Sequence, residues 1–578
     1  MQTATGTLSK RRRIFWLVPL IALALPLLTN PYTQFIANAM LIYTLVTLGF
    51  SVVIGNLGQL AFANTAFFGI GAYASAIAST SLGLPWLATI PIAGLAGALG
   101  GFLASAAALR GIRLYYLAIV TLAFGELMRW FYTHAGALTG GTDGLPVPRG
   151  RDFGLALSSG TVQFYVFLAI TCLLVAGTVN LLRSRIGRAI IAVRENEIAT
   201  ASLGIPTSQI IVTAFMWSGF IVGIAGAMFA LHTGRVFPES FGLTQLIVNF
   251  AMVLVGGLGS VVGAVLGAVA LTALPEYVRA FPGMEEIFFG VIVMVVLLVM
   301  PKGLASLLAR FPDLPTTLSQ GLTPMTSLLK VEGLSVHFSG LKALDNVSFE
   351  LEAGQVRAVI GPNGAGKTTL FNAISGYARP TAGSVLLEDA EIVHCSPHAI
   401  AEKGLRRTFQ NGGLFPALTV LENVMTGLHT QTPGTFFDVL LGRRKAVEAE
   451  IETREKARDL LKLMSMDHMA GTPAGDLSGG QQRIVEIVRT VASEPPVLLL
   501  DEPAVGLSPV ARQQMMEIIK RLSGEKGVGI LLIEHAVELV MAAADRILVM
   551  AAGTRISEGT PEEIRSDKAV LEAYLGHA

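Results

Sequence analysis

A glycine-rich segment, GPNGAGKTT, runs from Gly361 to Thr369 directly after the apolar run VRAVI. In such a segment Gly364 and Gly366 let backbone N–H groups close around phosphate oxygens, and Lys367 adds a positive charge to the same oxygens. A hydroxyl beside this lysine is a typical Mg²⁺ ligand in a nucleotide site, which assigns that role to Thr368. The segment therefore predicts a site for ATP and Mg²⁺. Its predicted ATP-binding residues are Gly361, Pro362, Asn363, Gly364, Ala365, Gly366, Lys367, Thr368 and Thr369.

A second candidate for chemistry is the segment VLLLDEP, from Val497 to Pro503. Its continuous apolar run indicates a strand buried on both faces, which would deliver Asp501 to the Mg²⁺ shell and place Glu502 beside it. A carboxylate in that place can orient and deprotonate an attacking water. The alternative is a helix with two acidic residues in its first turn, but the phosphate-binding segment upstream favours the strand. We therefore expect ATP hydrolysis, with Asp501 on the metal and Glu502 as a catalytic residue.

The charges are divided unevenly along the chain. Residues 1–327 carry 17 Lys and Arg against 10 Asp and Glu, whereas residues 328–578 carry 25 against 31. The front part has too few charges to coat a soluble domain, which excludes a wholly soluble enzyme. Its apolar runs are long enough to cross a bilayer as helices of about 20 residues, and we expect about 8–10 of them. The predicted spans lie near residues 14–30, 35–55, 60–80, 86–109, 114–132, 161–182, 210–231, 243–256, 260–276 and 287–300.

The positions of Lys and Arg predict the orientation of these spans. Basic clusters at 10–13, 110–113 and 183–194 mark cytoplasmic segments under the positive-inside rule, and the ATPase must also lie where ATP is. A cleaved signal peptide is the alternative interpretation of the N-terminus, but two prolines interrupt its apolar core. The glycines at 256, 257 and 259 predict either a tight turn between two short spans or a re-entrant hinge.

We expect three segments in the domain organisation. Residues 1–310 form an all-α polytopic membrane domain, residues 311–327 form a linker, and residues 328–578 form an α/β ATP-binding domain. The linker is rich in Pro, Thr and Ser and could reach at most about 60 Å if fully extended. After the linker, polar and apolar residues alternate in the segments KVEGLSVHF and NVSFELEAG. This alternation predicts edge strands that precede a parallel core.

The sequence LSGGQ, from Leu477 to Gln481, indicates which class of ATPase this is. With it, residues 328–578 resemble the nucleotide-binding domain of ATP-binding-cassette (ABC) transporters, a P-loop NTPase with a helical subdomain. The resemblance implies that the signature residues cap the γ-phosphate of ATP bound on a partner domain, and that Phe338 stacks on adenine. It also implies that Gln410 contacts the metal and the permease, and that His535 contacts the γ-phosphate. The implied signature residues are Ser478, Gly479, Gly480 and Gln481, the metal ligands are Thr368, Gln410 and Asp501, and the catalytic residues are Glu502, His535 and Gln410.

The front part resembles one permease subunit of bacterial branched-chain amino acid importers of the Liv type. The segments that carry this resemblance are 58–76, 114–130, 138–145 and 184–205. The ATPase half points the same way through RTFQNGGLFPALTVLENV and the C-terminal EAYLGHA. The chain departs from the family in one respect, because those permease and ATPase subunits are usually separate polypeptides.

The polar segment 184–205 lies between two predicted spans and carries Glu195 and Glu197. A short helix there could dock on the ATPase and transmit its closure, which makes both residues coupling-loop candidates. The alternative is an ordinary positive-inside loop. Within a span, Glu126 is a functional candidate by its location, but Arg129 lies on the same helical face and could simply pair with it.

Together these features predict an ATP-driven importer of branched-chain or related apolar amino acids, in which a permease is fused to its ATPase. The alternatives are a urea or short-chain amide importer, a fused-domain ABC exporter, and a non-transporting regulatory membrane ATPase. The resemblance implies a second permease subunit, a second ATPase subunit and an extracytoplasmic solute-binding protein as partners, and no nucleic acid. We expect a multi-pass protein of the bacterial cytoplasmic (inner) membrane, with its N-terminus and ATPase in the cytoplasm.

Overall fold

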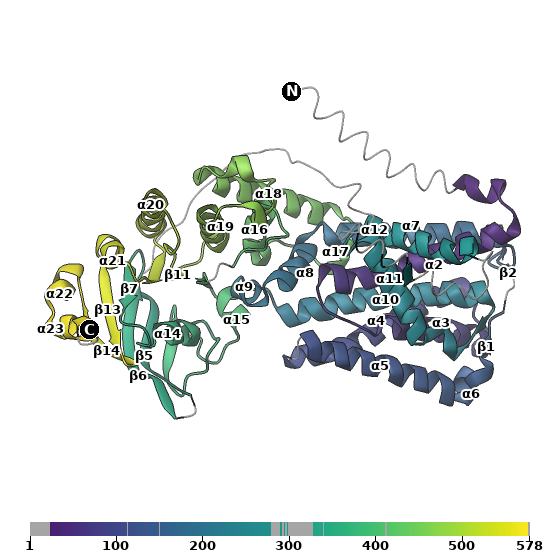
Figure 1. Ribbon diagram of the computed structural model, residues 1–578, viewed down its shortest axis with the longest axis horizontal. Coiled ribbons are helices and arrows are strands. Elements are labelled where there is room, and N and C mark those ends of the chain that lie inside the picture. Colours follow the sequence, from purple (N-terminus) through teal and green to yellow (C-terminus); the bar gives the residue numbers. More distant parts are fainter. Residues whose placement is uncertain are drawn as a thin grey trace, which may run out of the picture. The chain divides into compact units, whose positions relative to one another are not determined.

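The computed structural model describes residues 23–111, 114–148, 151–278, 290–291, 294, 298, 327–338, 340–410 and 413–575. The chain divides into two compact units (Figure 1). The first contains Met1–Leu182 and Ser208–Phe311, and the second contains Arg183–Thr207 and Pro312–Ala578. The predicted linker, 311–327, lies outside the described residues except for Ser327, which begins a strand.

The first unit is a bundle of apolar helices. Four described helical segments have the length and apolarity of membrane spans, namely Pro31–Asn56, Trp86–Arg110, Gly160–Leu182 and Thr207–Thr233. Two shorter apolar helices accompany them. The helices are α2 (Pro31–Ser51), α3 (Asn64–Ser81), α4 (Trp86–Ser105), α5 (Leu114–His134), α7 (Gly160–Leu182), α10 (Thr207–Thr233), α11 (Leu243–Gly256) and α12 (Val261–Val278).

Eight of the predicted spans coincide with these helices to within a few residues. The predicted spans near 14–30 and 287–300 lie largely outside the described residues, so the total of 8–10 stays a prediction. The glycine cluster forms a tight turn and not a hinge within a span: α11 ends at Gly256, Gly257 and Gly259 have positive φ, and α12 begins at Val261.

Glycines set how closely the helices of this bundle approach one another. A Cβ built on Gly97 would lie 2.1 Å from the carbonyl oxygen of Gly219, and one on Gly71 would lie 2.0 Å from that of Gly223. Such distances admit no side chain, so α3 and α4 pack directly on the backbone of α10. In α5, Arg129 donates to Glu126 over 2.7 and 2.9 Å, which confirms the local ion pair as the structural role of these residues.

The second unit contains two sheets. The larger has the strand order β10-β11-β12-β7-β13-β14, parallel except for the last pair. Its strands are β10 (Leu405–Arg407), β11 (Val497–Asp501), β12 (Gly529–Ile533), β7 (Val356–Ile360), β13 (Arg546–Ala551) and β14 (Thr554–Gly559). The smaller is antiparallel, in the order β6 (Leu341–Glu352), β5 (Ser327–Phe338), β8 (Ala382–Leu387) and β9 (Ala390–Glu391).

The two segments predicted as edge strands before the parallel core form β5 and β6 of this separate sheet, in which β6 is an edge strand and β5 pairs on both sides. The strands β5 and β6 pair along their whole length and β5 also pairs with β8, which leaves no ladder to the parallel strands. The sequence pattern identified them as strands but could not identify their partners, because strand pairing depends on long-range contacts.

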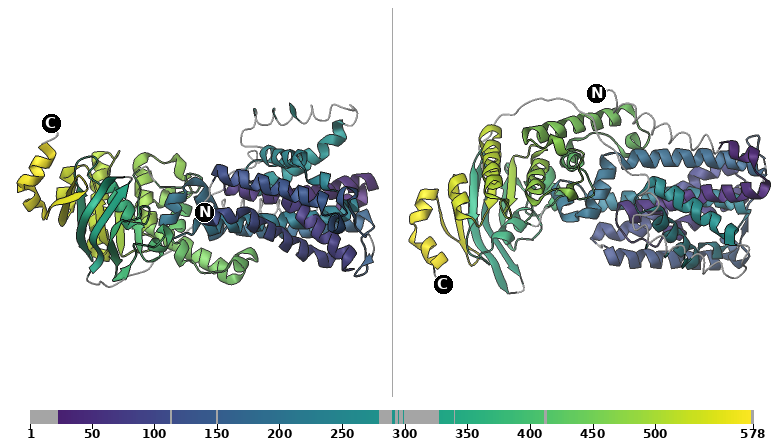
Figure 2. Two further views of the ribbon diagram at one scale, coloured as in Figure 1. Left: turned by 90° about the horizontal axis from the view of Figure 1, so that it is seen from below. Right: turned by 45° about the horizontal axis from the view of Figure 1, so that its top comes forward.

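Apolar side chains of the parallel strand β11 face two separate cores. On β11, Leu499 packs with helix α14 (Lys367–Ile374) and the antiparallel sheet, whereas Leu498 and Leu500 pack against α19 (Gly479–Val491) and α20 (Pro509–Lys526). The strands lie between these layers (Figure 2). Burial on both faces explains the continuous apolar runs noted in the sequence and confirms the α/β fold.

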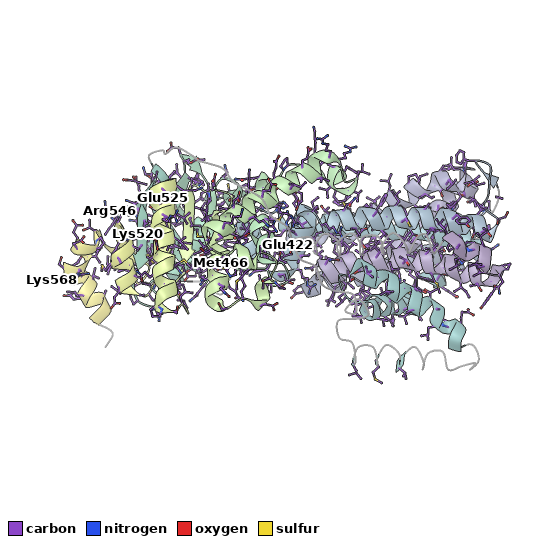
Figure 3. All side chains as sticks on the ribbon, turned by 90° about the horizontal axis from the view of Figure 1, so that it is seen from above. Glu422, Met466, Lys520, Glu525, Arg546 and Lys568 are labelled. Carbon is purple, nitrogen blue, oxygen red and sulfur yellow. The ribbon has the colours of Figure 1, made fainter. Side chains whose placement is uncertain are left out.

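A helical subdomain adjoins the parallel sheet. Helices α16 (Val420–Gly427), α18 (Arg444–Leu463) and α19 enclose an apolar core that includes Met466. Charged side chains such as Lys520, Glu525, Arg546 and Lys568 are exposed on this unit, as its composition requires of a water-facing surface (Figure 3).

Strand order brings the predicted site residues to one edge of the sheet. The phosphate-binding segment follows β7, His535 follows β12, Asp501 and Glu502 end β11, and Gln410 follows β10. Because these four strands are parallel neighbours, their carboxyl ends meet at the same edge, where ligands bind in open α/β sheets.

Candidate ATP-hydrolysis site

The phosphate-binding loop joins β7 to α14, as predicted. Its glycines have the backbone conformations that favour glycine, with φ of 82° at Gly364 and 95° at Gly366. A Cβ on Gly366 would also lie only 2.6 Å from the carbonyl oxygen of Ala343. The Lys367 Nζ donates to the carbonyl oxygens of Gly361 and Pro362 over 2.7 and 3.1 Å. The loop thus places the ammonium group over its own backbone, where phosphate oxygens would be cradled.

Burial lowers the pKa of Lys367, and the carboxylates of Glu502 and Asp501 oppose this shift. An anion that binds beside a poorly solvated ammonium group stabilises its charged form. A triphosphate is such an anion, so the electrostatics of the loop favour the predicted ligand.

Glu502 lies at the centre of the polar groups around the end of β11. Gln410 Nε2 donates to Glu502 Oε2 over 2.8 Å, and His535 Nε2 lies 2.9 Å from Glu502 Oε1. The backbone of Glu502 adopts a left-handed conformation with φ of 48°, and its N–H donates to the carbonyl oxygen of Ile533. A non-glycine residue in this region is strained, and such strain clusters at functional sites. The three residues predicted to be catalytic therefore meet at one carboxylate.

Sequence reasoning missed Arg407, which is paired with Asp501, the last residue of β11. Its guanidinium donates to Asp501 Oδ2 over 2.9 Å, and to Asn372 Oδ1 and Ser375 Oγ of the segment that follows the phosphate loop over 2.7 and 2.9 Å. Both charged side chains are almost fully buried. Burial lowers the pKa of Arg407, and Asp501 opposes this. One side chain thus connects the strands β10 and β11 with the helix that carries Lys367.

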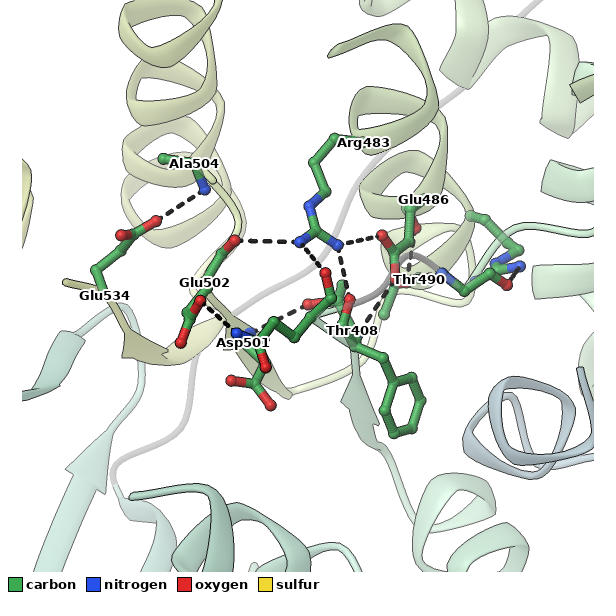
Figure 4. Close-up of polar contacts among 12 residues, drawn as sticks. Thr408, Arg483, Glu486, Thr490, Asp501, Glu502, Ala504 and Glu534 are labelled. Carbon is green, nitrogen blue, oxygen red and sulfur yellow. Dashed lines mark hydrogen bonds and ion pairs between the residues drawn. The ribbon is translucent and has the colours of Figure 1, made fainter. Parts of the chain in front are cut away.

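A second group missed from the sequence lies on the signature helix α19. Arg483 donates to the carbonyl oxygens of Phe409, Gln410 and Glu502 over 2.7 to 3.1 Å (Figure 4). Glu486 pairs with Arg483 over 2.7 Å and accepts hydrogen bonds from the N–H groups of Phe409 and Gly413. This pair holds the backbone on both sides of Gln410. Their spacing of three residues on the helix of the LSGGQ motif was the available signal.

Glu534 is the third missed residue, immediately before His535. It accepts a hydrogen bond from the N–H group of Ala504 over 2.8 Å (Figure 4). It also accepts one from the N–H group of His535 over 3.1 Å. Its carboxylate thus connects the segment after β11 to the segment after β12, and it fixes the backbone on which His535 stands.

The donor set around Asp501 fits Mg²⁺. No group of three His, Cys, Asp or Glu side chains suited to a metal ion occurs among the described residues. A magnesium ion in a nucleotide site needs no such group, because phosphates and waters supply most of its oxygen ligands and the protein adds one or two. Asp501 is a buried carboxylate at the strand end, and Thr368 offers an exposed hydroxyl in the first turn of α14.

The signature residues and Phe338 lie on the surface of the unit. Ser478 and Gln481 form a capping box at the start of α19, and Ser478 is exposed. Phe338 is 51% exposed. Within the described chain, no hydrogen bond joins the signature residues to the phosphate loop. The structure therefore brings Gln410, Asp501, Glu502 and His535 together but does not bring the signature residues to them.

Models of known protein families match both the permease part and the ATPase part of the chain. Residues 32–300 match a family model described as the permease component of the branched-chain amino acid transport system. Residues 344–505 match the ABC transporter model, and residues 554–578 match one described as the branched-chain amino acid ATP-binding cassette transporter.

Individual proteins resemble the ATPase half. The high-affinity branched-chain amino acid transport ATP-binding protein BraF of Pseudomonas aeruginosa is 41% identical over 251 residues, which are 43% of this chain and 98% of that protein. LivG of Escherichia coli K12, which has the same description, has the same identity and coverage. A solved structure, the ADP conformation of an ATP-binding cassette of an ABC transporter, is 33% identical, with a TM-score of 0.39 and coverage of 44% of this chain and 100% of that one.

This chain belongs to the branched-chain amino acid ABC transporter family. It contains a permease component and an ATP-hydrolysing cassette in one polypeptide, and the permease component and its apolar helices identify a membrane protein.

In this ABC transporter chain the polar segment between two spans folds with the ATPase. The segment forms α8 (Arg185–Glu195) and α9 (Glu197–Ser202) and belongs to the second compact unit. Arg183–Thr207 thus groups with the cassette, although it lies within the predicted membrane domain, 1–310. The reason is a set of polar contacts that the sequence could not reveal.

Arginines of α8 make the first contacts. Arg185 donates to the carbonyl oxygens of His429 and Gly434 over 3.2 and 2.5 Å, and Arg188 pairs with Glu450 of α18. Burial and the positive charges of Arg185 and Arg188 lower the pKa of His429 to about 3.

Backbone carbonyls of α9 make the second set of contacts. The Tyr377 hydroxyl donates to Ile198 over 2.8 Å, and Arg406 donates to Ser202 over 3.3 Å. The two predicted coupling residues bind side chains of their own segment. The Glu195 carboxylate lies 3.5 Å from the Arg194 guanidinium, and the Glu197 carboxylate accepts a hydrogen bond from the Thr207 hydroxyl. The ATPase contacts of this transporter segment are thus carried by arginines and carbonyls.

Proposed function

We propose that this chain uses ATP hydrolysis to import branched-chain or related apolar amino acids across the bacterial cytoplasmic membrane. The observation that carries the proposal is the meeting of Gln410, Glu502 and His535 in the unit that also holds α8 and α9. Those two helices continue directly into α7 and α10 of the permease. Names of the relatives supply the solute class.

Each site residue has a proposed role in hydrolysis. The loop from Gly361 to Thr369 cradles the phosphates, Lys367 neutralises them, and Phe338 stacks on adenine. Bound Mg²⁺ would be held by Thr368, Gln410 and Asp501, and it neutralises charge on the phosphates. Glu502 orients a water and takes its proton, and His535 donates a hydrogen bond to the γ-phosphate.

The signature residues serve a second cassette. Because Ser478, Gly479, Gly480 and Gln481 are not joined to the phosphate loop of this chain, they are available to cap ATP bound by another subunit. The proposed complex contains this chain, a second permease, a second ATPase and an extracytoplasmic binding protein. The N-terminus and both cassettes would lie in the cytoplasm.

Coupling would run through α8 and α9. Closure of the cassette on ATP would move the surface formed by Tyr377, Arg406 and Glu450, and the helices docked there would carry the displacement to the ends of α7 and α10. Glu195 and Glu197 would shape the turn between the two helices, beside the Asn196 cap.

Reconstituted transport tests this function. Proteoliposomes holding the chain with its partner subunits and binding protein are loaded with ATP, and uptake of radiolabelled leucine, urea and acetamide is measured. We expect leucine uptake that requires ATP and the binding protein. Uptake of urea or acetamide but not of leucine would contradict the proposed solute class. Net movement of solute away from the cytoplasmic side would show that the protein is an exporter.

A further inference from the structure

An exposed apolar and basic surface lies on the cassette around α17 (Phe436–Leu440) and the first two turns of α18. It spans residues 437–451, and we call it the 437–451 surface. Its exposed apolar side chains are Phe437 (66% exposed), Leu441 (60%), Val447 (47%) and Ile451 (51%). Val447 and Ile451 are four residues apart on α18 and so share one face of it. A water-soluble cassette has no reason to gather such side chains unless something covers them.

Basic residues run through the middle of this surface. Arg443, Arg444 and Lys445 are consecutive and exposed, and residues 437–447 contain Asp438 as their one acidic residue. Asp438 is bound to Arg443 over 2.9 Å and caps α17. Glu448 and Glu450 also lie within 437–451, where Glu448 pairs with Arg444 and Glu450 pairs with Arg188 of α8. Together with Arg188, the surface therefore has four basic residues against three acidic ones beside its aromatic and aliphatic set. Apolar side chains beside a basic run are typical of segments that lie in a membrane interface.

The covalent chain keeps this surface close to a membrane span. The span α7 ends at Leu182, and Arg185 follows three residues later, which is at most about 11 Å of extended chain. Arg185 is bound to the carbonyl oxygen of Gly434, three residues before Phe437, and Arg188 is paired with Glu450 inside the surface itself. Two contacts of α8 thus tether the surface to the cytoplasmic end of α7.

We propose that the 437–451 surface contacts the headgroup layer of the cytoplasmic leaflet, with its apolar side chains in the interface and its basic side chains on anionic lipid phosphates. The permease of the same chain is the less suitable occupant, since its predicted cytoplasmic cluster at 110–113 is itself basic and would repel Arg443, Arg444 and Lys445. The proposal goes beyond the transport function and does not depend on which solute is moved.

Lipid quenching in nanodiscs tests this contact on the full chain. In a background with Cys172→Ser and Cys395→Ser, Leu441→Cys is labelled with an environment-sensitive fluorophore, and the nanodiscs carry a lipid with a nitroxide headgroup. The matched control is Leu571→Cys, a 48% exposed leucine on α23 (Lys568–Leu575) of the same unit. Thermal unfolding of each labelled protein verifies folding.

We expect quenching at residue 441 at least threefold above that at 571 when the discs contain phosphatidylglycerol. Arg444→Gln with Lys445→Gln should weaken it severalfold, because each basic side chain near an anionic surface strengthens association about fivefold. Equal quenching at 441 and 571 would overturn the proposal. So would a label at 441 that is shielded from both the lipid nitroxide and aqueous iodide, since that result would place protein over the surface.

Discussion

Glu502 depends on its neighbours for the position of its carboxylate. Gln410 and His535 hold one oxygen each, and Arg483 holds the Glu502 carbonyl group. A water that attacks the γ-phosphate needs an acceptor in a fixed place, so this arrangement favours the carboxylate as that acceptor and the other groups as its supports.

We expect Glu502→Gln to abolish turnover and to retain ATP, because the amide cannot take a proton while the phosphate loop is intact. Steady-state hydrolysis and equilibrium ATP binding measure the two effects, and Lys367→Ala is the contrasting variant, in which binding itself should weaken. Residual hydrolysis above about a tenth of wild type would exclude Glu502 as the base. Unchanged nucleotide affinity in Lys367→Ala would exclude the assigned phosphate contact.

Arg407 gives a second prediction for single residues. In Arg407→Ala the buried Asp501 carboxylate loses its ion-pair partner, and breaking a buried pair costs about 3–5 kcal/mol. We expect a lower unfolding midpoint for the nucleotide-free protein and a larger stabilisation by Mg²⁺ with ADP, since the metal restores positive charge beside Asp501. Thermal unfolding with and without Mg²⁺–ADP measures both.

The control for this prediction is Arg443→Ala, an exposed arginine paired with Asp438. Arg443→Ala should change the free energy of unfolding by no more than about 1 kcal/mol, with or without Mg²⁺–ADP, because exposed ion pairs contribute little. If Arg407→Ala gained no more from Mg²⁺–ADP than wild type does, the ion would not be replacing the lost charge.

At the scale of elements, α8 and α9 decide how the permease and the cassette communicate. The segment contacts the cassette through Arg185, Arg188 and backbone carbonyls, and Glu195 and Glu197 are bound within or beside the segment. Coupling should therefore respond more to Arg188 than to either glutamate.

We expect Arg188→Glu to retain ATP hydrolysis and to lose most solute uptake, because it places like charges at Glu450. The double variant Arg188→Glu with Glu450→Arg should recover uptake by reversing the pair. Charge reversal at Glu195 and Glu197 should uncouple more weakly. Uptake and hydrolysis measured in the same proteoliposomes give the coupling ratio, and normal uptake by Arg188→Glu would exclude this contact from coupling.

The docking of α8 should also depend on pH through His429. Its pKa in the folded protein is about 3, well below the ordinary value of 6.5, because burial, Arg185 and Arg188 disfavour its charged form. The unfolded state binds the proton first as pH falls, so this stabilisation is complete above about pH 6.5 and is lost progressively towards pH 3. We expect His429→Gln to show a smaller loss of thermal stability than wild type between pH 7 and 5. Equal losses would show that His429 does not govern this dependence.

At the scale of the whole molecule, the proposed mechanism makes the chain one part of a larger assembly. The signature residues and the phosphate loop serve different nucleotides in the proposed mechanism, so a single cassette cannot complete an ATP site. This chain would supply one permease and one cassette of the proposed complex.

We expect the purified chain, reconstituted alone in lipid vesicles, to import no leucine even with ATP inside. Adding the second permease, the second ATPase and the binding protein should restore uptake. The measurement is ATP-dependent accumulation of labelled leucine with each component omitted in turn. Robust uptake by the single chain without a binding protein would overturn both the partner set and the importer proposal.

The sequence by itself determined the chemistry and the class of this protein. The phosphate loop, Asp501 and Glu502 could be predicted because their residue types follow buried apolar strands at short spacing, and such local patterns need no knowledge of distant contacts. For the same reason, eight predicted spans match helices to within a few residues.

Only the tertiary structure decided which distant residues support that chemistry. Arg407 meets Asp501 across 94 residues, and Arg483 reaches the Phe409 carbonyl across 74. The segment 183–207 groups with the cassette through contacts that span some 180 to 260 residues. Pairings of this kind follow from strand order and packing, which depend on the whole chain at once, and no local pattern contains them.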